Sequence, residues 1–171
     1  MVQVFSRVRG ALLVGACAVL LSGCAGNVAP EVKRLPERVE LSGTFYRGEA
    51  NQSGPQVLAS LLSQQGIVIT PGLLEKPLHL PGAEDKLQQN MQNLAREYGL
   101  VVYPLDSELP ALLTQVAAGY PVMVRFSEGS AFWAEPRYAI LSGYDRNKQK
   151  VLLRAGMNRR QLMDFGSFQA A

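Results

Sequence analysis

The chain has 171 residues, with 17 Lys and Arg against 14 Asp and Glu, so its formal net charge is only +3. This excess is too small to predict binding to nucleic acid. A single histidine, His79, excludes a metal site built from several histidines, and nothing in the composition calls for a cofactor.

The first 23 residues have the pattern of a bacterial lipoprotein signal peptide. Arg7 and Arg9 precede an apolar stretch over residues 11–21, and the stretch ends in Leu21-Ser22-Gly23-Cys24, the order of a lipobox. A helix that spans a bilayer needs roughly 20 apolar residues, so a transmembrane anchor is the weaker interpretation. We expect cleavage before Cys24 and a lipid on its thiol, whereas an ordinary signal peptide would leave Cys24 unexplained.

Cleavage would change the composition. The mature chain would keep 148 residues (171 − 23) and a net charge of +1 (15 − 14), because Arg7 and Arg9 leave with the signal. Cys17 would also leave and Cys24 would be acylated, which excludes a cysteine nucleophile and a zinc–thiolate site. Ala25, rather than an aspartate, follows the cysteine. The lipoprotein sorting pattern then predicts the outer membrane, with the protein facing the periplasm.

Residues 24–41 are expected to form a lipidated tether, because they are polar and charged, contain Pro30 and Pro36, and show no sustained apolar period. The remaining residues, 42–171, are enough for one domain with its own core.

The first half of this domain has helical periodicity. Apolar stripes follow Gln52, run from Leu87 to Tyr98 and run from Leu109 to Ala117, and each is followed by a glycine: Gly66, Gly99 and Gly119. The pair Thr70-Pro71 predicts the start of a short helix that continues through Leu74, after an extended run at Ile67–Ile69. These stripes are predicted to be core faces.

The second half changes to short β-branched or aromatic segments separated by turn residues. We expect strands at Leu100–Tyr103, Pro121–Phe126, Tyr138–Tyr144 and Val151–Arg154, with a hairpin turn at Asp145–Lys148 between the last two. Helices followed by an antiparallel sheet predict an α+β domain.

Four segments resemble one family. Asn51-Gln52-Ser53-Gly54-Pro55 and the residues to Ala59 resemble the Gln-Cys-Gly-Pro-x-x-Leu-Ala motif of bacteriocin-processing, or double-glycine, peptidases, which are papain-like cysteine peptidases. Leu80-Pro81-Gly82 with the following helix, Gly119–Val124, and Pro136–Asp145 resemble later segments of the same family. The resemblance covers about residues 44–160. It implies a papain-like fold, with a helical first half packed on an antiparallel sheet.

The catalytic positions depart from the family. Ser53 stands at the position of the nucleophilic cysteine, and Arg137 stands at that of the histidine. An arginine stays protonated and cannot accept the proton of a nucleophile. Arg47 and Gly48 lie where the oxyanion glutamine is expected, and Ala155 offers no side chain to orient a histidine. The resemblance therefore implies an inactive member of the family.

Ser53 has two further interpretations. Ser53-x-x-Gln56 fits a capping box, in which the serine oxygen accepts a hydrogen bond from the backbone amide three residues later. Hydrolysis by Ser53 is the less favoured alternative, because a hydroxyl without a base is a weak nucleophile. We expect His79 to be a solvated loop residue outside the former cleft.

Ser53, Gly54, Arg137 and Trp133 are the candidate ligand-binding residues of the former groove. A cationic side chain opposite a helix N-terminus favours an anionic group, such as a peptide C-terminus. Phe132 and Trp133 are candidates for an apolar wall or for core packing. A basic cluster is interpreted as either a hydrated hairpin surface or a patch for anionic lipid or an acidic partner; it consists of Arg146, Lys148, Lys150, Arg154, Arg159 and Arg160.

We therefore expect a lipid-anchored envelope protein that binds a peptide or protein partner in a groove that has lost its catalytic residues. An active hydrolase that uses Ser53 and a structural lipoprotein of an envelope assembly are the two alternatives.

Overall fold

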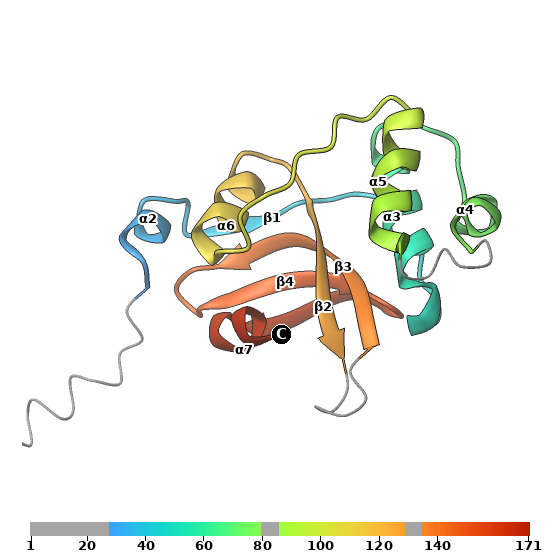
Figure 1. Ribbon diagram of the computed structural model, residues 1–171. Coiled ribbons are helices and arrows are strands. Elements are labelled where there is room, and N and C mark those ends of the chain that lie inside the picture. The colour runs from blue at the N-terminus through green and yellow to red at the C-terminus, as the bar shows by residue number, and fades with distance from the viewer. Residues whose placement is uncertain (1–27, 80–85, 129–134) are drawn as a thin grey trace, which may run out of the picture. The chain divides into compact units, whose positions relative to one another are not determined.

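The computed structural model describes residues 28–79, 86–128 and 135–171 (Figure 1). The chain divides into two compact units, Met1–Pro30 and Glu31–Ala171, and the second contains the folded domain. Several expected features lie outside the described residues: the signal peptide, Cys24, Leu80-Pro81-Gly82, Phe132 and Trp133.

The compact unit that contains the folded domain begins at Glu31, so residues 31–41 are part of it. A short helix, α2 (Pro30–Lys33), is followed by strand β1 (Arg38–Glu40). Val32 is only 1% exposed, and β1 pairs with residues 143–145 of the sheet. The polar composition concealed this strand, because a three-residue edge strand needs few apolar side chains.

Four helices follow β1: α3 (Ser53–Gln64), α4 (Pro71–Leu78), α5 (Leu87–Glu97) and α6 (Leu109–Ala117), with a 3-10 turn, η2 (Ala50–Gln52), directly before α3. The sheet follows with β2 (Val122–Glu128), β3 (Glu135–Asp145), β4 (Lys150–Ala155) and β5 (Asn158–Asp164), and helix α7 (Phe165–Ala170) ends the chain. The predicted α+β architecture is confirmed at this level.

All strand pairs are antiparallel, and β3 is the central strand. β4 pairs with one edge of β3 and continues the sheet to β5. β2 and β1 share the other edge, because β2 pairs with residues 135–141 and β1 pairs with residues 143–145.

The three predicted helix stops are confirmed. Gly66, Gly99 and Gly119 have φ of +82°, +85° and +96°, a conformation that glycine adopts at little cost. Around each one, two backbone hydrogen bonds close the helix; for α3 they are Gly66 N to Ser63 O (3.1 Å) and Ile67 N to Leu62 O (3.2 Å). This pattern is the Schellman motif.

The core lies between α3 and one face of β3, with α4 and α5 packed against α3. The predicted stripes supply it, since Val57, Leu58 and Leu62 of α3 and Met91 of α5 are buried. Tyr98, the last residue of its expected stripe, is instead exposed.

The expected strand at Leu100–Tyr103 is wrong, because these residues pair with no strand in the described part of the chain. The alternation that suggested a strand is present nevertheless. Leu100 and Val102 pack against the core, whereas Val101 and Tyr103 are 74% and 76% exposed. The segment is extended without being part of the sheet.

Candidate functional site

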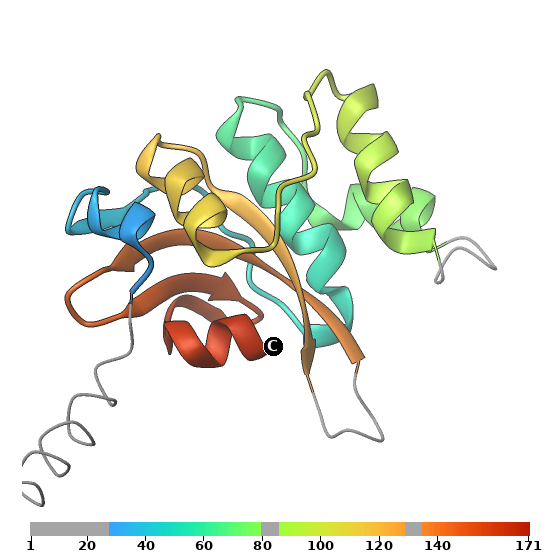
Figure 2. The same cartoon turned by 60° about the vertical axis from the view of Figure 1, so that its left-hand side comes forward.

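The start of α3 lies beside the first half of β3 (Figure 2). Ser53, the first residue of α3, is only 5% exposed, and its Oγ accepts a hydrogen bond from the backbone amide of Tyr138 at 3.1 Å. The start of α3 thus meets the start of β3 through Tyr138, the residue after Arg137, which lies 85 residues from Ser53 in the sequence.

The sheet explains why Ser53 takes this contact. β4 pairs with β3 only from Ile140 onwards, so it does not reach the Tyr138 amide. A buried amide without an acceptor is costly. The Ser53 hydroxyl supplies that acceptor where β4 has ended.

The expected capping box is not formed. The N-cap of α3 is Gln52, one residue earlier, and it makes no side-chain capping hydrogen bond. Gln56 does not reach back to Ser53, because its Nε2 donates to the carbonyl of Glu49 at 3.2 Å. Local sequence spacing suggested a cap, but the hydroxyl is used by a strand that is distant in sequence.

Arg137 is partly buried, and strand alternation constrains its direction. Tyr138 and Ile140 belong to the core that includes α3, so Arg137 shares the opposite face with Ala139 and Leu141. Backbone proximity does not by itself bring the guanidinium to Ser53. The strand alternation therefore does not support the expected position of the Arg137 guanidinium opposite the N-terminus of α3.

Gly48, one of the two positions where the oxyanion glutamine was expected, contributes only its backbone. Gly48 N donates to Gly156 O at 3.2 Å, and a Cβ on Gly48 would lie 2.0 Å from Gln56 Nε2. A side chain at position 48 would force the end of the buried Gln56 side chain to shift. The Gln56 Nε2 group is already bonded to Glu49.

Gly54 also has a packing role. It is buried, and a Cβ there would lie 3.0 Å from Sδ of Met91 on α5. Neither Ser53 nor Gly54 presents a surface to a ligand. Of the four candidate residues, Arg137 is the partly exposed one in the described part of the chain, since Trp133 lies outside it.

An open hollow of about 470 Å³ lies next to these residues. Among the described residues it is lined by the polar and charged side chains of Asn51, Gln52, Glu75, Lys76 and His79. η2 supplies the first two directly before Ser53, and α4 supplies Glu75 and Lys76, with His79 at its C-terminal end. Sequence reasoning missed this site because it placed His79 away from the former cleft.

His79 is held by the helix that precedes it. Its Nδ1 lies 3.2 Å from the carbonyl oxygen of Glu75. A neutral imidazole that donates from Nδ1 leaves Nε2 as an acceptor. The hollow therefore combines two amide side chains, a carboxylate, an ammonium group and an imidazole, which together both donate and accept hydrogen bonds.

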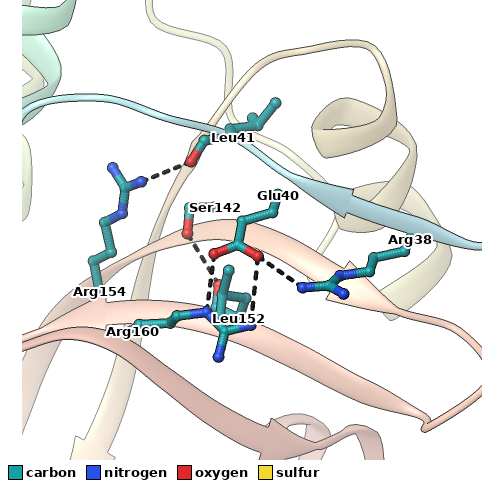
Figure 3. Close-up of polar contacts among 7 residues, drawn as sticks. All are labelled: Arg38, Glu40, Leu41, Ser142, Leu152, Arg154 and Arg160. Atoms are coloured by element: carbon teal, nitrogen blue, oxygen red, sulfur yellow. Dashed lines mark hydrogen bonds and ion pairs between the residues drawn. The ribbon is translucent and has the colours of Figure 1, made fainter.

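Most side chains of the basic cluster form hydrogen bonds or ion pairs within the domain. Arg154 donates to the carbonyls of Leu41 at 2.6 Å and Gly43 at 3.1 Å, and Arg160 binds Glu40 (Figure 3). Lys150 pairs with Asp164 at 3.2 Å, and Arg146 Nη1 donates to the carbonyl of Lys33. Four of its six members thus join strands and the N-terminal segment.

Within residues 28–79, 86–128 and 135–171, no helix is long and apolar enough to cross a membrane. The same ranges hold no group of three or more His, Cys, Asp or Glu side chains that would suit a metal ion. Comparisons with protein-family models, with curated proteins and with solved structures gave no match.

Proposed function

We propose that this chain is a lipid-anchored envelope protein whose domain is a papain-like, double-glycine-peptidase-like scaffold without catalytic activity, and that it binds a peptide or protein segment. The observation that carries the proposal is the state of Ser53. Its hydroxyl is buried and already accepts the Tyr138 amide, so it is neither accessible nor activated.

The start of a helix beside the start of a central strand is the juxtaposition that the family resemblance implies for its cleft. It supports a papain-like scaffold, because Ser53 and Tyr138 are distant in sequence and meet through a single buried contact. The former nucleophile position has taken on a structural role, which is what loss of catalysis with retention of the fold would produce.

The hollow before Ser53 is the surface that we assign to binding. An extended peptide presents backbone donors and acceptors, which the side chains of Asn51 and Gln52 can match. Lys76 would bind an anionic group of the peptide and Glu75 a cationic one. Nε2 of His79 would accept a hydrogen bond from a peptide N–H. These residues replace the Ser53–Arg137 pair as the centre of the proposed groove.

Binding is tested with a fluorescent peptide library against the purified protein. Lys76→Ala should weaken the best peptide about tenfold or more, because a charge-assisted hydrogen bond contributes roughly 1.5–3 kcal/mol. Lys148→Ala is the matched control, since Lys148 is exposed on the β3–β4 turn. An equal loss of affinity in both variants would show that the hollow is not the binding surface.

Catalysis and anchoring are tested separately. The protein should cleave no peptide after a Gly-Gly pair, and Ser53 should not react with a fluorophosphonate; turnover that disappears in Ser53→Ala would establish the hydrolase alternative. Labelled palmitate should enter the full chain and not Cys24→Ala, because that thiol is the proposed site of the lipid. Absence of any peptide ligand, with palmitate incorporated, would favour the structural lipoprotein.

A further inference from the structure

The short connection between Cys24 and the folded unit determines which face of the domain meets the membrane. This inference depends on the lipid anchor of the proposed function. Folding extends to the N-terminal end of the second unit, which begins at Glu31. Val32 is buried, and the guanidinium of Arg146 donates to the carbonyl of Lys33.

Six residues separate Cys24 from Glu31 (30 − 24). Seven peptide units span at most about 25 Å when fully extended. A domain of this size has a radius of gyration near 14 Å, and hence a diameter of roughly 35–40 Å. The connection is shorter than the domain is wide, so the lipid cannot reach a membrane that lies against the far side of the domain.

The surface nearest to Glu31 is made of two segments that are bonded to each other. Arg146 N donates to the carbonyl of Glu37 at 2.8 Å, and Asn147 Nδ2 donates to the Glu37 carboxylate. We call this surface the α2 face; it comprises α2, residues 34–37 and the turn Arg146–Gln149. Its exposed cations are Lys33, Arg34 and Lys148, and its exposed acids are Glu31 and Glu37.

We propose that the α2 face rests on the phospholipid headgroups of the membrane that holds the anchor. Its three exposed cations against two exposed acids leave an excess of one positive charge, so the short connection, and not charge, is the main reason for this orientation. The hollow lies at the other end of the domain, since η2 and α4 are far from α2 in both views (Figures 1 and 2). The β4–β5 turn is at that far end as well, because Gly156 O is bonded to Gly48 N, two residues before η2.

This orientation has a functional consequence. A domain on a long tether would present its hollow in every direction, whereas this one would point the hollow away from the bilayer. The partner would therefore be recognised from the aqueous side, and a segment embedded in the same membrane would not reach Asn51 and His79.

The test uses the acylated full chain in vesicles of phosphatidylethanolamine and phosphatidylglycerol, with a nitroxide quencher on a fraction of the headgroups. Acylation of Cys24 and removal of Cys17 with the signal leave an introduced cysteine as the one reactive thiol. Lys148→Cys labels the α2 face, and Met157→Cys labels the opposite end of β4, where Met157 is 61% exposed. Circular dichroism and thermal melting check that both variants fold.

A fluorophore at Lys148→Cys should be quenched several-fold more strongly than one at Met157→Cys. Insertion of about twenty Gly and Ser residues after Ala29 should remove the difference, because a flexible tether of that length permits every orientation. Equal quenching with the original connection, in protein that incorporates labelled palmitate, would overturn the orientation while the anchor stands. Failure of palmitate to enter Cys24 would overturn both proposals.

Discussion

Ser53 shows how one side chain can resemble a catalytic residue and a helix cap while it serves a third role. The capping interpretation paired Ser53 with Gln56, three residues later, and the catalytic interpretation paired it with the Arg137 side chain. In the structure, the Ser53 hydroxyl accepts a hydrogen bond from the backbone amide of Tyr138, which lies beyond the end of β4. A serine at this position is explained by the need of a buried donor for an acceptor.

Replacement of Ser53 by alanine should therefore destabilise the domain. The Tyr138 amide would be left buried without its acceptor, which costs about 1–3 kcal/mol in the free energy of unfolding. Urea denaturation measures this change, and Ser127→Ala, at an exposed position on β2, is the control. A Ser53→Ala protein as stable as the control would mean that the hydrogen bond contributes nothing.

The carboxylate of Glu40 forms ion pairs with two arginines, Arg38 and Arg160 (Figure 3). Arg160 donates from Nε at 2.9 Å and from Nη2 at 3.4 Å, and Arg38 donates from Nη2 at 3.1 Å. The hydrogen bond from Arg160 is the largest cause that holds the pKa of Glu40 below its ordinary value, and Arg38 adds to it.

This pKa shift predicts a pH-dependent contribution to stability. A carboxyl group with a lowered pKa in the folded state stabilises the fold above its unfolded pKa, near 4.3, and loses that effect as the pH falls through the folded pKa. Glu40→Gln should lower stability by less than about 1 kcal/mol at pH 7, because the pair is solvent-exposed. The difference from wild type should shrink as the pH falls below the unfolded pKa and through the lowered folded pKa.

Urea titrations at pH 7, 5 and 3 measure the Glu40→Gln difference, with Glu97→Gln at the end of α5 as the matched carboxylate. A Glu40→Gln difference that persists unchanged at the lowest pH would show that packing, and not charge, makes the contribution.

At the scale of elements, β1 joins the sheet because β3 has a glycine opposite it. Gly143 pairs with Glu40, and a Cβ on Gly143 would lie 2.3 Å from the carbonyl oxygen of Val39. That atom is backbone and cannot move without moving β1. The close approach of two strands thus depends on the absence of one methyl group.

Gly143→Ala should detach or displace β1 and destabilise the domain by about 1–3 kcal/mol, the usual cost of overpacking. Gly72→Ala is the matched control, because nothing lies within 4 Å of a Cβ at that helical position. It should be neutral or stabilise the protein by up to about 1 kcal/mol. Thermal melting compares the two variants. An equal change in their midpoints would show that the close approach of β1 to β3 does not require glycine at position 143.

The sequence predicted the elements that local physics determines. The stripes of α3 and α6, the three glycine stops and the β3–β4 turn follow from periodicity and from backbone freedom. β1 and β5 were missed, because their side chains are mostly exposed and carry no alternating apolar signal. Leu100–Tyr103 alternates as a strand does, but pairing requires a neighbour that the sequence does not reveal.

The same distinction applies to the candidate site. The resemblance predicted that the start of α3 would meet the start of β3, and it does. The hollow could not be predicted, because η2 and the end of α4 converge only in three dimensions. A buried hydroxyl that accepts from a distant amide also leaves no sequence pattern.

At the scale of the whole molecule, basic side chains fasten the N-terminal segment to the sheet. Arg146 binds the carbonyl of Lys33, Arg154 binds those of Leu41 and Gly43, and Arg160 binds Glu40. These arginines lie on β4, β5 or the turn after β3, more than 100 residues later in the chain. The N-terminal segment is therefore an integral part of the domain.

This arrangement gives a prediction about where the domain begins. A protein that starts at Glu31 should unfold with the same urea midpoint as one that starts at Cys24, because residues 24–30 precede the folded unit. A protein that starts at Ser42 should lose at least about 2 kcal/mol, the contribution of burying one side chain such as Val32, before the pairing of β1 is counted. It would also leave the Arg154 guanidinium without the Leu41 carbonyl. Equal midpoints for the Glu31 and Ser42 proteins would restore the longer tether and remove the reason for the α2 face to lie on the membrane.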